Sequence, residues 1–272
     1  IKIEDMSRRL ISIISIVLLS QLLVSAQGPY PTADQIKGFR NTTLLVVLDG
    51  RDVAFDAYLK DAINKHWNIS EFKFVDTEEF DAQKSNPNYS FLATLQVQFD
   101  RDPEEHVYHF LYVLLSHPTA DLQEMPVIAQ VPFLGSTLTS SSHLHKTEML
   151  VKFIQNYTTQ VVASNGDQKY RKLKHLNKGI RKLKSKTLIL SEDQIDPSLR
   201  DEESLSKAYK HVVKLVSSDN LVDLMGKAEK GNVFIHLVAP DEDATSGQCF
   251  KMIIEPATGE AFFYKKHKIN SS

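Results

Sequence analysis

The segment Thr43-Leu44-Leu45-Val46-Val47-Leu48 is a short aliphatic and β-branched run of the kind that forms a buried strand. A similar run, Thr187-Leu188-Ile189-Leu190, occurs later in the chain. Two further pairs of segments match at nearly the same separation: residues 72–80 with 213–221, and residues 90–93 with 233–236. One separation shared by three matches is typical of an internal repeat, so the sequence predicts two similar units that arose by duplication.

Each unit is expected to fold as β-α-β-α-β-β, with a mixed sheet and helices packed on it, which makes the fold class α+β. In the first unit, residues 40–134, apolar side chains recur at helical spacing over residues 53–67 and predict an amphipathic helix. A short capped helix is expected after Asp76. The other expected strands lie at residues 71–75, 90–99, 106–116 and, as one further strand, 127–133.

The second unit, residues 187–269, is expected to follow the same order. Helices are predicted at residues 204–214 and 220–228, and a strand at residues 214–216. The unit is expected to close with a hairpin at Pro256-Ala257-Thr258-Gly259, because Pro and Gly suit its tight turn.

Residues 135–186 have no counterpart in the repeat and are predicted to form a loop followed by a helical, basic linker. The part at residues 169–186 holds nine Lys or Arg in 18 residues. Its apolar residues, Leu173, Leu176, Ile180 and Leu183, repeat at spacings of 3, 4 and 3, so one face of a helix here would be apolar.

This basic stretch has two interpretations. Its cations could contact an anionic membrane or a cell-wall polymer, with Lys172, Lys174, Arg181 and Lys182 as the binding residues. The alternative, which the sequence favours, is a helix laid on the core with a solvated basic face.

Residues 1–26 have the features of an export signal. Arg8 and Arg9 precede an uncharged aliphatic run at residues 10–24, and Val24-Ser25-Ala26 offers the small residues that a signal peptidase reads. The run is shorter than the roughly 20 residues of a membrane-spanning helix. We therefore expect cleavage between Ala26 and Gln27, a periplasmic or extracellular location, and no transmembrane segment in the mature chain.

Composition excludes some classes of function. The formal net charge of −2 gives no indication of nucleic-acid binding. The sequence contains no glycine-rich phosphate loop, no His-Glu-x-x-His and no Gly-x-Ser-x-Gly, which lowers the expectation of an enzyme, and no cofactor is expected. The single Cys249 cannot form an internal disulfide.

Asp49-Gly50-Arg51-Asp52 ends a hydrophobic strand, where α/β folds often place ligands. Asp49 and Asp52 are the candidate catalytic residues, and Arg51 is a further binding candidate. The haloacid-dehalogenase phosphatases have two acids one residue apart after such a strand. Here the spacing is three, which places nucleophile and acid in the wrong geometry, so a polar loop is the favoured interpretation.

His143 and His145 are the candidate metal ligands, because they could share an ion if a third ligand came from elsewhere in the chain. The favoured interpretation of these residues is a pair of surface histidines. No metal is expected on the sequence alone.

The origin of the chain has two indications. Five asparagines begin Asn-x-Ser/Thr sequons, namely Asn41, Asn68, Asn88, Asn156 and Asn270, which would suit a eukaryotic secreted protein. A short signal without disulfides fits a bacterial envelope better. Ser25-Ala26-Gln27, Lys73-Phe74-Val75-Asp76 and the closing hairpin at residues 255–260 resemble uncharacterised exported proteins of Bacteroidetes-type bacteria. This resemblance implies export and no particular activity.

The leading hypothesis is an exported, non-catalytic binding or assembly module of the bacterial cell envelope. Its two units would present a groove or an open sheet edge to an unknown protein or envelope polymer. The alternatives are a periplasmic hydrolase that uses Asp49 and Asp52, and adhesion to a membrane or polymer through residues 169–186. The ligand and the oligomeric state stay open.

Overall fold

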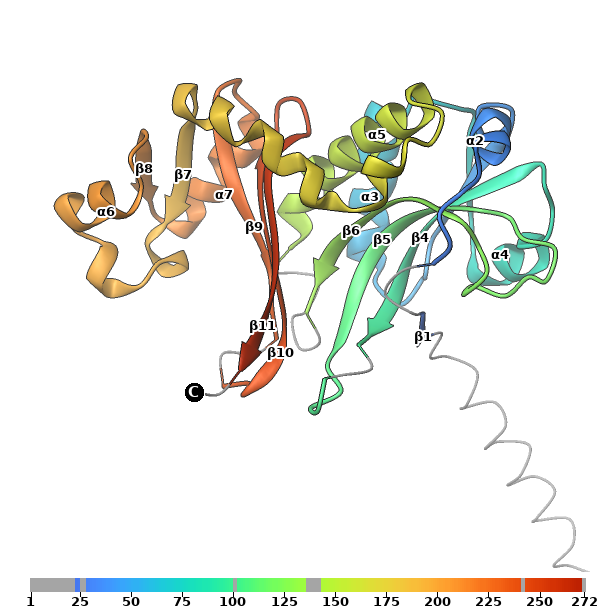
Figure 1. The fold of residues 1–272 in the computed structure, drawn as a ribbon, viewed down its shortest axis with the longest axis horizontal. Coiled ribbons are helices and arrows are strands. Elements are labelled where there is room, and N and C mark those ends of the chain that lie inside the picture. Colours follow the sequence, from blue (N-terminus) through green and yellow to red (C-terminus); the bar gives the residue numbers. More distant parts are fainter. Residues whose placement is uncertain (1–22, 25–27, 100–101, 136–142, 241–242, 271–272) are drawn as a thin grey trace, which may run out of the picture.

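The computed structural model describes residues 23–24, 28–99, 102–135, 143–240 and 243–270. The fold is α+β: two mixed sheets lie beside each other, and helices connect them and cover their upper ends in Figure 1. This arrangement confirms the predicted fold class and the two similar units.

The first sheet has the strand order β3-β2-β4-β5-β6. Strand β2 pairs parallel with β3 and β4, and β5 pairs antiparallel with β4 and β6. A two-residue strand, β1 (Leu23–Val24), also pairs parallel with β4. The five main strands are β2 (Thr43–Val47), β3 (Phe72–Val75), β4 (Tyr89–Gln98), β5 (Val107–Leu115) and β6 (Val127–Leu134).

The second sheet repeats this topology. Its order is β11-β10-β9-β7-β8, with β7 parallel to β8 and β9, and with β10 and β11 antiparallel. Read from the β8 edge, each strand takes the place of its counterpart in the first sheet, which is consistent with duplication. Its strands are β7 (Thr187–Ser191), β8 (Val213–Val216), β9 (Asn232–Val238), β10 (Ser246–Glu255) and β11 (Glu260–Asn270).

Side-chain caps start the helices at related places in the two units. Asp76 accepts a hydrogen bond from Glu79 N at the start of α4 (Thr77–Gln83), and Ser217 accepts one from Asn220 N at the start of α7 (Ser218–Lys227). Both caps directly follow the second strand of their unit. The remaining α-helices outside the linker are α2 (Ala33–Phe39), which precedes the first unit, α3 (Val53–His66) and α6 (Glu202–Ala208). Two short 3₁₀ helices, η5 (Glu192–Gln194) and η6 (Pro197–Leu199), lie between β7 and α6.

The helix expected at residues 204–214 is the least accurate prediction in the second unit. The observed α6 begins after its cap Asp201 and ends at Ala208, where Tyr209 takes an extended conformation. Val212 and Val213 follow, and β-branched side chains favour the strand β8 over a longer helix.

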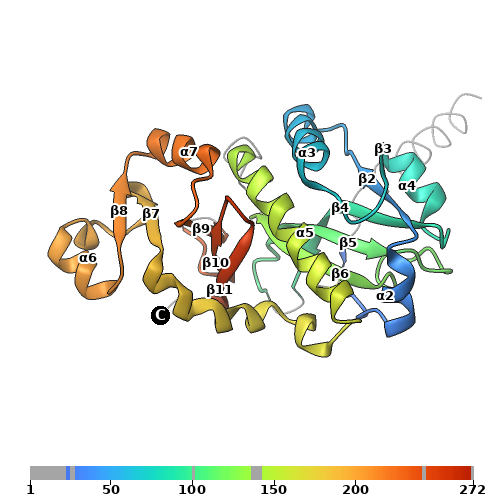
Figure 2. The ribbon, with the colours of Figure 1, turned by 90° about the horizontal axis from the view of Figure 1, so that it is seen from above.

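The linker between the units is the centre of the packing. It contains η2 (Leu144–Lys146), α5 (Thr147–Ala163), η3 (Gln168–Arg171) and η4 (Leu173–Ser185). Figure 2 shows α5 between the two sheets, and it contacts α3 and β6 on one side and β10 and β11 on the other. One apolar cluster therefore runs from Leu92 of the first sheet through Phe153 of α5 to Met252 of the second.

Residues 173–185 form a 3₁₀ helix that lies along β11, instead of the predicted amphipathic helix with four apolar residues on one face. Leu173, Leu176 and Leu183 are buried, whereas Ile180 is 47% exposed. Because a 3₁₀ helix has three residues per turn, Gly179 follows Leu176 on the packed side, and a Cβ there would lie 3.2 Å from Phe262 Cα.

Within the residues that the structure describes, no helix is both long and apolar enough to span a membrane.

Candidate functional site

The nine cations of residues 169–186 divide into those that form ion pairs and those that do not. Three of the nine form ion pairs: Lys169 with Asp167 at 2.9 Å, and, each at 2.7 Å, Lys182 with Glu260 and Lys186 with Glu255. Six have no carboxylate partner within 4.0 Å in the described part of the chain, and all six are exposed: Arg171, Lys172, Lys174, Lys178, Arg181 and Lys184. We call these six residues the basic row.

A cavity of about 390 Å³ lies beside the basic row, between α5, the two 3₁₀ segments and the turn that leads into β11. The cavity has cationic, amide and aromatic walls and a single carboxylate. The residues that carry these groups are Lys169, Lys178, Lys182, Asn156, Gln160, Tyr157, Tyr170, His175 and Glu260.

The aromatic wall of the cavity is held by hydrogen bonds. Tyr157 Oη donates to the backbone oxygen of Tyr170, and the ring centroids of Tyr170 and His175 are 4.8 Å apart. His175 Nδ1 donates to the Lys172 carbonyl at 2.8 Å. Burial lowers the pKa of His175, so this imidazole is neutral at neutral pH and the charge of the cavity comes from its lysines.

Asp49, Arg51 and Asp52 form local structure at the end of β2. Arg51 forms an ion pair with Asp49 through its guanidinium, and this hydrogen bonding raises the pKa of Arg51. Asp52 caps α3 by accepting from Phe55 N at 2.9 Å. Gly50 N donates to the buried Asp56 at 2.9 Å and fixes the turn. Each carboxylate thus has a local structural partner.

We expect Asp52→Ala to lower the free energy of unfolding by about 1 kcal/mol, because a lost N-cap costs about that much. Asp49→Ala removes an exposed ion pair and should cost less than about 1 kcal/mol. Urea denaturation of both variants measures these values. A loss of phosphoester or glycoside hydrolysis in either variant would instead support the hydrolase alternative.

The interpretation of His143 and His145 as surface residues is wrong. His143 is 6% exposed, and burial lowers its pKa to about 3 and that of His145 to about 4. Across the described ranges, no group of three or more His, Cys, Asp or Glu side chains is arranged to hold a metal ion. The structure therefore brings no third ligand to this pair from the residues that it describes.

These histidines belong to a buried basic cluster that sequence reasoning missed. Lys146 is 6% exposed, and burial lowers its pKa to about 8. His236 of β9 is fully buried, donates from Nε2 to the Pro132 carbonyl at 2.7 Å, and has its pKa lowered to about 3. We name His143, His145, Lys146 and His236 the basic cluster. It joins the linker to both sheets.

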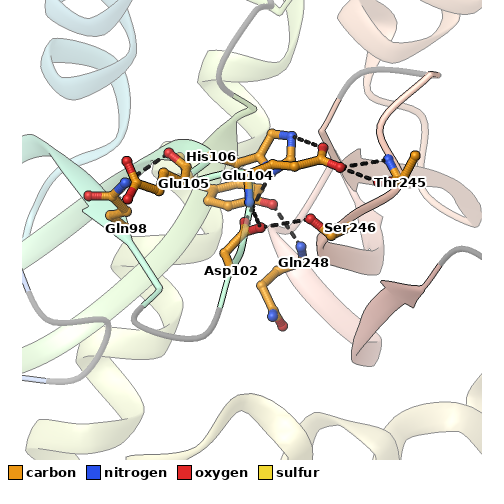
Figure 3. A network of polar contacts seen from close by, with 9 residues as sticks. Gln98, Asp102, Glu104, Glu105, His106, Thr245, Ser246 and Gln248 are labelled. Atoms are coloured by element: carbon orange, nitrogen blue, oxygen red, sulfur yellow. Dashed lines mark hydrogen bonds and ion pairs between the residues drawn. The ribbon is translucent and has the colours of Figure 1, made fainter.

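A second polar group connects the two units at the ends of the long strands that lie away from α5 (Figure 1 and Figure 3). His106, just before β5, lies between two carboxylates: Nδ1 is 3.0 Å from Asp102 Oδ2, and Nε2 is 3.3 Å from Glu104 Oε2. Ser246 of β10 donates to Asp102 Oδ1 at 3.0 Å, and Thr245 donates to Glu104 through both its backbone N and its hydroxyl.

We call Asp102, Glu104, His106, Thr245 and Ser246 the interunit clamp. Although it contains Ser, His and Asp, its hydrogen bonds do not match nucleophilic catalysis, because the Ser246 hydroxyl donates to Asp102 and not to the imidazole. The buried carboxylate of Asp102 accepts from both units. The arrangement holds the β4–β5 connection of the first unit against the start of β10 in the second unit.

Comparison with protein-family models, with curated proteins and with solved structures finds no match to this chain.

Proposed function

We propose that this protein is an exported, non-catalytic binding module of the bacterial cell envelope, which holds an anionic polymer against the basic row. The observation that carries the proposal is the set of six exposed cations without a carboxylate partner in the described chain. Most of them follow one another along η4, whose buried leucines anchor it on β11. A fixed line of like charge attracts a polyanion over several contacts at once.

The burial of the leucines favours a polymer over a membrane. An amphipathic helix that binds a bilayer inserts its apolar face into the lipid. Here Leu173, Leu176 and Leu183 pack against the protein, and Ile180 is the one apolar residue of the predicted face that is exposed. The contact would thus be made by charges, which suits a hydrated polymer.

Local structure at Asp49 and Asp52 supports a non-catalytic role. Both carboxylates take part in the turn and cap that connect β2 to α3. The cavity beside the basic row lies elsewhere, on the linker and the second unit.

The combined charge reversal Lys172→Glu, Lys174→Glu and Arg181→Glu tests the proposal. Each cation near an anionic surface contributes about 1 kcal/mol, so the variant should bind immobilised polygalacturonate at least about 100-fold more weakly. Binding by the wild-type protein should also weaken as the salt concentration rises from 50 to 300 mM, on the order of several-fold, because salt screens exposed charges. Biolayer interferometry measures both effects.

A matched control carries the same charge change elsewhere: Lys60→Glu, Lys73→Glu and Lys210→Glu, all at exposed positions. This variant should keep most of its affinity. Equal losses in the two variants would show that only the net charge matters, which would refute a defined binding row. Binding to phosphatidylglycerol vesicles without binding to the polymer would favour a membrane ligand instead.

A further inference from the structure

We infer that the cavity between α5, η4 and the turn before β11 is a subsite for one acidic sugar unit, such as a uronate or a sugar phosphate. This inference rests on the proposed function, since it assigns the polymer's chemistry and the place where one of its units is bound.

The charges of the cavity favour an anion. Lys169, Lys178 and Lys182 contribute three cations to its lining against one carboxylate, Glu260. Lys182 and Glu260 already form an ion pair at 2.7 Å, and Lys169 pairs with Asp167 outside the lining. Lys178 has no ion-pair partner within 4.0 Å among the described residues, so it is the cation best placed to receive a ligand's carboxylate or phosphate.

The neutral polar groups of the cavity suit hydroxyls. Asn156 and Gln160 present amides from one face of α5, and the Asn156 side chain is fixed by its hydrogen bond to the Thr258 carbonyl. The Glu260 carboxylate, held by Lys182, is a further acceptor. Amides and carboxylates both form hydrogen bonds with sugar hydroxyls. The partly exposed rings of Tyr170 and His175 add apolar surface to the cavity lining.

One wall of the cavity, the turn before β11, is packed closely on α5, and a wall that is already in place lowers the cost of binding. Gly259 has a positive φ of 68°, and a Cβ at this position would lie 2.5 Å from the backbone carbon of Lys152. The turn is therefore in close contact with α5, and Lys152 Nζ also donates to the Pro256 carbonyl at 3.1 Å. The volume of about 390 Å³ falls within the range of small-ligand pockets, which is about 300 to 1,000 Å³.

The cavity is continuous with the basic row. Lys178 belongs to both, and Arg181 and Lys184 follow it along η4. A polymer with one unit in the cavity could continue along these cations. The linker and the β10–β11 turn that build the site also have no repeat in the first unit, whose β5–β6 connection is a longer loop.

Isothermal titration calorimetry with short ligands tests the subsite separately from the basic row. Digalacturonate is the carboxylate probe and glucose 1-phosphate is the phosphate probe. We expect wild-type protein to bind at least one of them. Lys178→Gln removes the unpaired cation and Gln160→Trp fills the cavity, and each should weaken binding at least tenfold.

Matched controls make the same changes outside both the lining and the basic row: Lys60→Gln and Thr159→Trp, both at exposed positions. These variants should bind the short probes within about threefold of wild type, and thermal unfolding should confirm that all variants are folded. The double variant Lys172→Glu, Lys174→Glu should likewise keep short-ligand binding, because neither residue lines the cavity.

The outcomes distinguish the two proposals. If neither short probe binds, or if Lys178→Gln and Gln160→Trp bind as well as wild type, the subsite is refuted even where the polymer still binds. If a short probe binds in the cavity but polygalacturonate binding does not depend on the basic row, the proposed polymer function is refuted instead.

Discussion

The free energy of unfolding is expected to decrease by several kcal/mol as the pH falls from 7 to 5, because the three histidines of the basic cluster are held in their neutral form in the folded protein. Burial lowers the pKa of His143 and His236 to about 3 and that of His145 to about 4, from an ordinary value of 6.5. The neighbouring positive charge of Lys146 acts in the same direction on all three.

The sign of this effect follows from where protons bind. Below pH 6.5 the unfolded chain takes up protons at these histidines, while the folded protein excludes them until the pH approaches 4 or 3. The stabilisation is therefore complete above pH 6.5 and is lost as the pH falls. For each histidine, the free energy of unfolding falls by about 1.4 kcal/mol per pH unit below 6.5. Each histidine therefore contributes a loss of about 2 kcal/mol at pH 5.

Lys146 should make the free energy of unfolding depend on pH in the alkaline range as well. Its folded pKa of about 8 lies below its ordinary value of 10.5, so the unfolded state holds the proton more tightly over this interval. Stability should therefore rise between pH 8 and pH 10.5. At pH 7 the buried ammonium is a cost, and Lys146→Met should increase the free energy of unfolding by on the order of 2 kcal/mol.

His236→Gln tests the acid sensitivity directly. The glutamine side-chain amide can replace Nε2 as the donor to Pro132 and cannot take up a proton in this pH range. Urea denaturation at pH 7 and pH 5 should show that the variant loses about 2 kcal/mol less free energy of unfolding between these pH values than the wild type does. The control His211→Gln changes an exposed histidine and should leave the pH dependence unaltered. A wild-type stability that stays constant from pH 7 to pH 5 would contradict the prediction.

The strands were predictable because each depends on a local pattern, and the two similar units were predictable because those patterns recur in the same order. Aliphatic runs such as Thr43–Val47 and the capped turn at Asp76 carry the signal within a few residues. The predicted helical face of residues 173–185 was only partly correct, since the choice between 3.6 and 3.0 residues per turn depends on packing against β11. In the 3₁₀ helix, Gly179 and not the predicted Ile180 lies against β11.

The basic row was predictable from composition, whereas the cavity beside it was not. Gln160 of α5 and Glu260 of β11 line the same cavity because α5 packs against β11, and no spacing in the sequence records that contact. The basic cluster was missed for the same reason. His143 and His145 lie next to a Ser-rich stretch that is typical of exposed loops, and their burial depends on β9.

Asp102→Ala is expected to reduce the free energy of unfolding by about 2 to 4 kcal/mol, since it leaves His106 Nδ1 and the Ser246 hydroxyl without their buried acceptor, and each unsatisfied buried group costs about 1 to 3 kcal/mol. The Asp102 side chain is fully buried, and its two oxygens accept from His106 at 3.0 Å and from Ser246 at 3.0 Å. Ser246→Ala removes one donor of the second unit and should cost only about 1 kcal/mol, because the carboxylate keeps His106.

A double-mutant cycle shows whether the clamp joins the two units. If Asp102 and Ser246 interact across the interface, the double variant Asp102→Ala, Ser246→Ala should be more stable than the sum of the single losses predicts, by about 1 kcal/mol. Hydrogen exchange should accelerate first at the paired backbone of Gln248 and its neighbours, because Gln248 N donates to Tyr108 Oη at 2.7 Å beside the clamp. A cost below about 1 kcal/mol for Asp102→Ala would contradict a structural role. Additive losses would mean that Asp102 stabilises only the β4–β5 loop that contains it, and that the two sheets are held together by other contacts, such as the apolar cluster around α5.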